Sequence, residues 1–195
     1  MPTAHRDTRL TYEDFVCFPD DGMRHELIDG VHYVTPSPVT RHQLLVTRLL
    51  VAIGSYLELH PKVGQVFGSP LDTVFSPWDI VEPDLIFVAA DQSEILTEAN
   101  IQGAPALVVE MLSPSTRKRD LGIKRQLFER GGVREYWVVD PKANDIAIYR
   151  RQPDGTLPKV LQLTSADAAT LSTPLLPGFT LLLAKLFAPL FPDRR

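Results

Sequence analysis

The sequence predicts an α/β protein with a central mixed β-sheet flanked by helices. Residues 106–112 and 135–139 form two near-continuous apolar runs of strand length, which indicates buried strands. Residues 116–130 between them have the apolar spacing of a helix, which should end at Gly131-Gly132. A strand, a helix and a strand at this spacing form a βαβ unit, so we expect parallel strands and a right-handed crossover.

Two short elements are expected before this unit. Residues 11–18 predict a helix that Thr11 caps. Residues 25–33 predict a hairpin, because Asp29-Gly30 is a strong type I′ turn signal between two short runs.

The remaining elements follow from apolar spacing and from Pro and Gly breaks. Residues 39–59 carry a helical apolar pattern that ends before Pro61. Residues 146–150 should pair antiparallel with the strand before them. The other expected strands cover residues 63–67, 71–75 and 84–89.

Length and composition favour one domain over residues 1–195, with a polar N-terminal tail at 1–10. Cys17 is the one cysteine, which fits the reducing cytoplasm. The apolar run 179–191 is too short to span a bilayer, so we expect a C-terminal helix that packs on the core, and no membrane association.

Charge is distributed unevenly along the chain, whose net charge is −4. Residues 63–116 contain no Lys, Arg or His, whereas residues 117–134 contain seven basic residues. The pattern indicates either a solvated charged surface or a carboxylate metal site beside a surface that attracts phosphates. In the second case the nucleic-acid contacts would come from Arg117, Lys118, Arg119 and Arg125.

Two charged residues interrupt the apolar face of the basic helix. On a helical wheel, Asp120 and Lys124 fall among Ile123, Leu127 and Phe128, and they are i,i+4 neighbours. Burying a charge costs several kcal/mol unless it is paired or used. We therefore expect the fold to need Lys124 at this position.

Two carboxylates should lie near this lysine. Glu110 lies within a buried strand, and Asp84 follows Pro83 at the start of another. On neighbouring strands, at about 4 Å, they would repel by roughly 4 kcal/mol at an effective dielectric near 20, so they would need a proton or a cation. Oxygen ligands of this kind select Mg²⁺ or Mn²⁺, and a lysine beside such a metal suits phosphodiester hydrolysis.

Several motifs resemble the Uma2 family of restriction-endonuclease-like proteins. They are Pro83-Asp84, Val-Val-Glu-Met-Leu-Ser-Pro-Ser-Thr at 108–116, and Gly-Val-Arg-Glu-Tyr-Trp-Val-Val-Asp-Pro at 132–141. The resemblance covers roughly residues 10–185. It implies the PD-(D/E)XK nuclease superfamily, with a restriction-endonuclease-like fold and a metal-dependent endonuclease that acts on nucleic acid, DNA foremost.

The resemblance also implies roles for particular residues. Asp84 matches the first motif carboxylate and Glu110 the second, so both would hold the metal. The superfamily lysine normally stands two residues after the second carboxylate, where this chain has Leu112. The resemblance suggests that the lysine has migrated to the helix as Lys124, the residue that the wheel singles out.

Three auxiliary residues have open alternatives. Glu26 is either a further metal carboxylate or a surface residue of the hairpin. His42 is either a base or nucleic-acid contact, or a cap or surface histidine. Asp120 either pairs with Lys124 or binds a water near the metal.

The leading hypothesis is an Mg²⁺- or Mn²⁺-dependent nuclease with Asp84 and Glu110 on the metal and Lys124 as catalytic base. By analogy, it could act as a homodimer on a duplex. The alternative is an inactive module that binds nucleic acid or protein, since the net charge is negative and the strand lysine is missing. A glycosidase would leave Lys124 unexplained.

Overall fold

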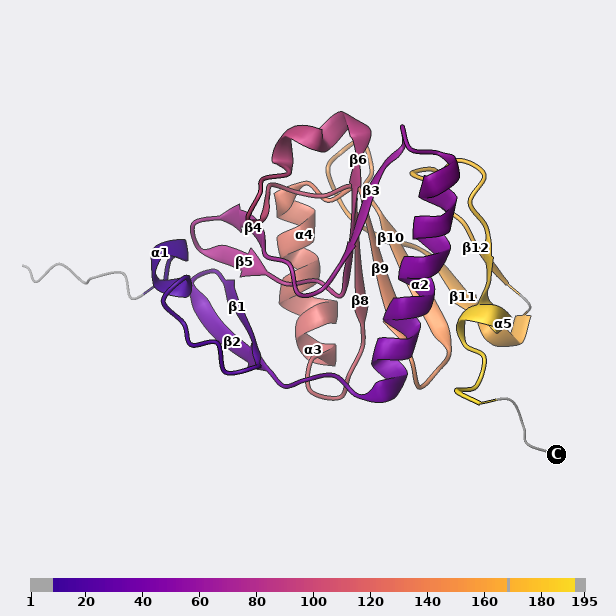
Figure 1. Ribbon diagram of the computed structural model, residues 1–195, viewed down its shortest axis with the longest axis horizontal. Coiled ribbons are helices and arrows are strands. Elements are labelled where there is room, and N and C mark those ends of the chain that lie inside the picture. The colour runs from indigo at the N-terminus through magenta and orange to yellow at the C-terminus, as the bar shows by residue number, and fades with distance from the viewer. Residues whose placement is uncertain (1–8, 168, 192–195) are drawn as a thin grey trace, which may run out of the picture.

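The computed structural model describes residues 9–167 and 169–191, so most of the expected tail at 1–10 lies outside the described residues. The expected α/β class with a mixed sheet is confirmed (Figure 1). The larger sheet has six strands in the order β11-β10-β9-β8-β6-β3. In chain order they are β3 (Gly64–Gly68), β6 (Leu85–Ala89), β8 (Leu107–Met111), β9 (Glu135–Asp140), β10 (Asp145–Arg150) and β11 (Lys159–Thr164).

The predicted βαβ unit forms the centre of this sheet. β8 and β9 are parallel, with Val108 beside Tyr136 and Glu110 beside Val138. β10 pairs antiparallel with β9, as expected. β6 pairs antiparallel with β8, and this pairing brings the start of β6 to the end of β8.

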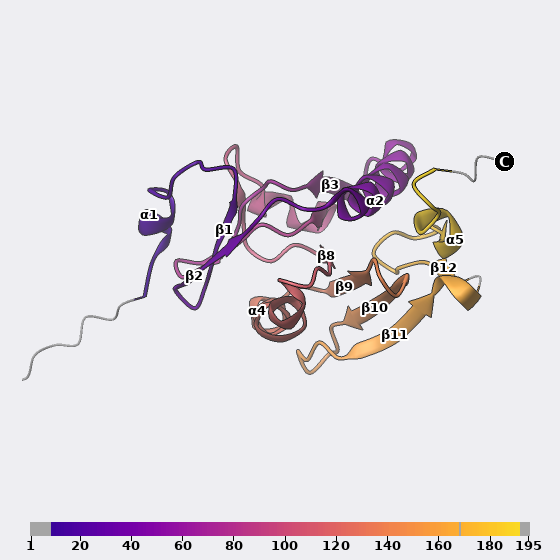
Figure 2. The same cartoon turned by 90° about the horizontal axis from the view of Figure 1, so that it is seen from below.

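Helices cover both faces of the larger sheet, as Figure 2 shows for α2 and α4. The long helix α2 (Thr40–Leu59) buries Leu45, Leu49 and Ile53 against one face. The helix between β8 and β9 buries Leu127 and Phe128 against the other face. Alternate residues of β8 serve the two cores, because successive strand side chains point to opposite faces.

A second, smaller sheet was not foreseen. It has the strand order β2-β1-β5-β4-β7. Its members are β1 (Arg24–Ile28), β2 (Val31–Thr35), β4 (Thr73–Ser76), β5 (Asp79–Val81) and β7 (Ile101–Gln102). The strands expected at 63–67 and 71–75 therefore belong to different sheets. The hairpin prediction is confirmed, since Asp29 and Gly30 both have positive φ angles, 56° and 71°.

The prediction for the C-terminal segment 179–191 is wrong. Its one helix is α5 (Leu183–Leu186), a single turn, and β13 (Leu181–Leu182) precedes it and pairs with β12 (Thr170–Leu171). Pro189 cannot continue a helix, because it lacks an N–H and its ring clashes with the preceding turn. The segment still packs on the core, where Leu183 and Leu186 are buried.

The other helical elements are short. α1 (Tyr12–Phe15) is shorter than expected, although Thr11 caps it through a capping box with Asp14. Two 3₁₀ turns, η1 (Ala90–Ile95) and η3 (Ser165–Asp167), follow β6 and β11. No helix in the described part of the chain is long and apolar enough to cross a membrane.

Candidate active site

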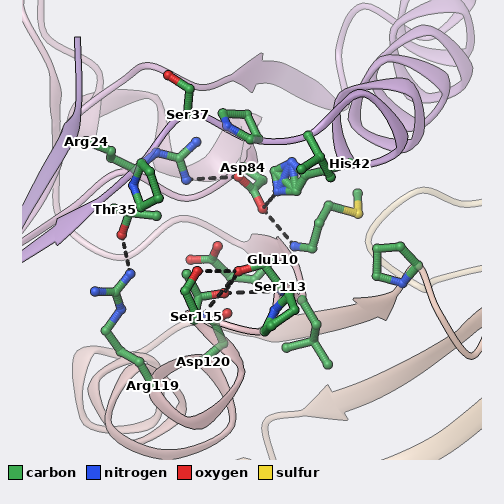
Figure 3. Close-up of a pocket in the computed structure, with 18 of the residues that line it drawn as sticks. Arg24, Thr35, Ser37, His42, Asp84, Glu110, Ser113, Ser115, Arg119 and Asp120 are labelled. Carbon is green, nitrogen blue, oxygen red and sulfur yellow. Dashed lines mark hydrogen bonds and ion pairs between the residues drawn. The ribbon is translucent and has the colours of Figure 1, made fainter.

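A pocket of about 300 Å³ opens where the two sheets meet the helix that follows β8 (Figure 3). Its lining brings together residues from five separate parts of the sequence: residue 24, residues 35–42, residue 84, residues 110–124 and residues 141–142. The sequence-predicted residues among them are His42, Asp84, Glu110, Arg119, Asp120 and Lys124.

Asp84 and Glu110 face each other across two neighbouring strands. The antiparallel register pairs Leu85 with Val109, and its continuation places Asp84 opposite Glu110. Asp84 Oδ2 accepts a 2.7 Å hydrogen bond from the backbone N–H of Met111, which fixes the carboxylate beside β8. The juxtaposition expected from the sequence is therefore present.

The helix over this site contains a π-helical turn. α3 (Arg117–Arg119) leads into the π turn η2 (Asp120–Lys124), which continues into α4 (Arg125–Gly131). Such turns insert one residue into the helix and occur often at functional sites. Here the turn contains both inward charges, and Tyr136 Oη donates a hydrogen bond to its first carbonyl, that of Asp120.

Lys124 is the centre of the charge cluster. Its Nζ lies 2.7 Å from Glu110 Oε1 and 2.7 Å from Glu26 Oε1, whereas Asp120 Oδ1 is 4.0 Å away. Lys124 is 1% exposed and Glu26 is 0% exposed. The i,i+4 pair of the helical wheel is therefore the loosest of its three ion pairs.

The cluster holds more buried carboxylates than cations. The cations are Arg24, Arg119 and Lys124, and the carboxylates are Glu26, Asp84, Glu110 and Asp120. Burial raises the pKa of Glu110 well above its ordinary value; Asp84 adds to this effect, and Lys124 only partly offsets it. Burial likewise raises the pKa of Asp120. One further positive charge, a proton or a metal ion, would balance the cluster.

Lys124 and Glu26 shift the other way. Burial lowers the pKa of Lys124, but Glu110, Glu26 and Asp120 outweigh burial and raise it. Burial raises the pKa of Glu26, but Lys124 and then Arg119 outweigh it and lower the pKa below its ordinary value. Both groups are therefore charged at neutral pH.

Some carboxylate oxygens here could serve a metal ion. Glu26 Oε2 and both Asp120 oxygens are buried without a hydrogen bond. The oxygen-only donor set has the chemistry that Mg²⁺ and Mn²⁺ require. Within residues 9–167 and 169–191, no three His, Cys, Asp or Glu side chains are arranged to hold a metal. The oxygen atoms of the cluster are therefore of the right chemical type for a metal ion, and the two facing carboxylates, Asp84 and Glu110, are its first candidate ligands.

His42 and Glu26 are not surface residues. His42 is buried near the start of α2, and its Nε2 lies 3.0 Å from Asp84 Oδ2. Burial lowers the pKa of His42, Asp84 opposes this, and Arg24 reinforces it. The surface alternatives for both residues are wrong, because Glu26 and His42 are both buried.

Arg24 is the site residue that sequence reasoning missed. Its Nη1 donates a 2.9 Å hydrogen bond to Asp84 Oδ1, and its Nη2 donates one to Ser69 Oγ. Arg24 and Glu26 are two residues apart and therefore lie on the same face of β1. This spacing is the sequence feature that could have indicated Arg24 as a second charged residue beside Glu26.

The basic face of the helix differs from expectation. Arg117 is paired with Asp140 at 2.6 Å, and Arg125 with Glu129 at 3.1 Å. Arg119 turns inward, where it donates to Thr35 and lies 3.5 Å from Glu26 Oε2. Lys118 is exposed. The four residues therefore do not form one outward phosphate-binding surface.

The mixed α/β fold is shared with a solved structure. A crystal structure described as a putative nuclease belonging to DUF820, from Anabaena variabilis ATCC 29413, superimposes with a TM-score of 0.76 and 19% identity, over 91% of this chain and 97% of that one. Residues 12–184 match the sequence model of the Uma2 family, described as "Putative restriction endonuclease". The chain belongs to the Uma2 family. Among curated proteins, none matches it.

Proposed function

We propose that this protein is a metal-dependent nuclease that hydrolyses phosphodiester bonds in nucleic acid, with DNA as the first candidate. One observation carries the proposal: Lys124 Nζ, from the helix, lies 2.7 Å from Glu110, which faces Asp84 in the same pocket. Leu112 stands where the strand lysine would be, and its side chain packs into the core instead.

Asp84 and Glu110 would hold Mg²⁺ or Mn²⁺. The metal would activate water and neutralise charge on the transferring phosphorus. Asp120 and Glu26 are further carboxylates of the same cluster, and His42 holds Asp84 in place through Oδ2. The excess of buried negative charge supports a cation at this position.

Lys124 would contribute as an ammonium group. Its raised pKa, caused by three carboxylates that outweigh burial, keeps it charged. A charged lysine orients a nucleophile and stabilises a phosphorane-like charge. A lysine that stays charged suits this role, which the sequence also suggested, better than the role of catalytic base in the leading hypothesis.

The test is cleavage of plasmid DNA, single-stranded DNA and RNA with Mg²⁺ or Mn²⁺. We expect Glu110→Gln to lower the rate by at least about 100-fold, as for loss of a group that acts in the transition state. The matched control is Glu129→Gln on the outer face of α4. Equal rates for wild type and Glu110→Gln on every substrate would refute the proposal.

One observation favours the alternative of an inactive binding module. Both oxygens of Asp84 already have protein partners: Arg24 on Oδ1, and His42 with the Met111 N–H on Oδ2. Calorimetry with Mn²⁺ separates the two functions. Mn²⁺ binding to the wild type that is lost in Asp84→Asn would support the nuclease. Absence of Mn²⁺ binding to the wild type would support the inactive binding module.

A further inference from the structure

We infer that the site takes an unpaired nucleotide, so that its substrate is single-stranded nucleic acid rather than continuous duplex. The inference rests on the proposed function and narrows its substrate class. Three features carry it: the depth of the reacting groups, the stiffness of the pocket walls and the pairing of many arginines with other groups of the protein.

The candidate reacting groups lie at the bottom of the pocket. Asp84 is 2% exposed, Glu110 3% and Lys124 1%. The pocket volume of about 300 Å³ is at the lower end of the range for sites that enclose one small molecule. A phosphate must enter the pocket to reach these groups, and the space suits one nucleotide and excludes a paired helix.

Two loops form opposite walls of the pocket (Figure 3). Residues 36–39 join β2 to α2 and carry Ser37, whereas residues 112–116 join β8 to α3 and carry Ser113 and Ser115. Figure 3 shows Ser37 on one side of the two carboxylates, with Ser113 and Ser115 on the other.

These walls are built to resist opening. Four prolines line the pocket: Pro36, Pro38, Pro114 and Pro141. A proline ring fixes φ and so reduces the freedom of each loop. The second loop is also tied internally, since Ser113 Oγ lies 3.0 Å from both Ser115 Oγ and Thr116 Oγ1. Stiff walls disfavour widening the mouth to admit a base pair.

Most arginines of the described residues are unavailable for a long duplex footprint, and the exposed cations at or near the pocket include Lys118 and the lining residue Lys142. Duplex binding draws its affinity from many Lys and Arg contacts to phosphates. The net charge is −4, and many arginines of the described residues are held by protein groups. They include Arg41, Arg48, Arg117, Arg125, Arg130, Arg134, Arg150 and Arg151. A single inserted nucleotide needs far fewer such contacts.

The first test compares binding without divalent metal, so that no cleavage occurs. Fluorescence anisotropy of the full chain would use one labelled oligonucleotide, either single-stranded or annealed to its complement. We expect the single strand to bind at least about tenfold more tightly than the duplex. Equal or tighter binding of the duplex would overturn the inference.

The second test closes the mouth of the pocket. Ser37→Trp and Ser115→Trp place a large ring on opposite walls, and both serines are exposed in the wild type, so folding should survive. We expect each variant to weaken single-strand binding by about tenfold or more. The control is Ser93→Trp in η1, which follows the other end of β6 and should leave binding unchanged. Rim variants that bind like the wild type would refute the pocket as the entry site.

Cleavage with Mn²⁺ distinguishes failure of this inference from failure of the proposed function. Rapid cutting of a continuous duplex would support the nuclease and overturn the preference for unpaired nucleotides. Single-strand binding that the rim variants weaken, without cleavage of any substrate, would keep the pocket assignment and refute the nuclease.

Discussion

The two faces of the helix between β8 and β9 carry charge in opposite ways. On the inner face, Asp120 and Lys124 are each 1% exposed. On the outer face, the side chain of Arg117 is 55% exposed and that of Arg125 is 30% exposed, and each pairs with one neighbouring carboxylate. Charged residues of one helix are thus buried on one face and exposed to water on the other.

The difference lies in hydration. Exposed ion pairs contribute about 0–1 kcal/mol, because water and salt screen them. Buried charges lose that hydration, so their pairing dominates local stability, and removing one partner costs about 3–5 kcal/mol. Burial of charged groups on the inner face costs free energy of desolvation, and for that reason we place the function there.

The largest contrast should come from matched lysine substitutions. Lys124→Met leaves Glu26 and Glu110 buried without their shared partner, so the free energy of unfolding should fall by about 3–5 kcal/mol. Lys118→Met on the exposed side should change it by no more than about 0.5 kcal/mol. Urea unfolding followed by circular dichroism measures both. Similar losses would mean that the inner cluster has no special energetic weight.

Glu110→Gln should separate stability from activity. Because burial raises the pKa of Glu110, an uncharged side chain of the same shape suits the position. We expect a smaller change in the free energy of unfolding than for Lys124→Met, because Lys124 keeps Glu26 as an ion-pair partner, while cleavage is lost. Thermal unfolding beside the nuclease assay checks this. A large loss of stability would instead make Glu110 a structural ion-pair partner.

The pH dependence of stability should have opposite signs in the two regions. Beside the pocket, burial raises the pKa of Glu82 to about 7, despite the opposing effect of Arg24. The folded protein therefore holds this proton more tightly than the unfolded chain, and this contribution is lost as pH rises from 4.5 to about 7. The free energy of unfolding of Glu82→Gln minus that of the wild type should therefore be more favourable at about pH 8 than at about pH 4.

Asp140 on the outer side is the control for that measurement. Burial raises its pKa, but hydrogen bonds from Arg117 and from the Ala143 and Lys142 backbone outweigh burial and lower it. Its contribution is present above the unfolded pKa and is lost as pH falls, so Asp140→Asn should be most destabilising near neutral pH. Unfolding curves at the two pH values for both variants test this; slopes of the same sign would contradict it.

The smallest effect should come from the outer basic residues. Because Arg117 is already paired with Asp140, the double substitution Arg117→Ala and Lys118→Ala should weaken nucleic-acid binding by no more than about threefold. The salt dependence of binding should change by about one phosphate contact or less. A loss of nucleic-acid affinity above about tenfold would instead show that the outer face of the helix binds phosphates.

Much of the local structure followed from the sequence. Period-two alternation placed Glu110 among the apolar residues of β8, and the helical wheel turned Asp120 and Lys124 inward. The Asp29-Gly30 turn closed its hairpin as predicted, because a type I′ turn depends on the conformations of two adjacent residues. The C-terminal helix failed, because its apolar residues are used in a short strand and a single turn.

The assembly of the site was decided by the tertiary structure. The sequence by itself determined that Asp84, Glu110 and Lys124 would lie in or beside buried elements, since burial patterns are local. That Glu26 binds Lys124, and that Arg24 binds Asp84, depends on how the smaller sheet meets the larger one. These contacts join residues about 60 to 100 positions apart, and no short-range pattern encodes a pairing at that separation.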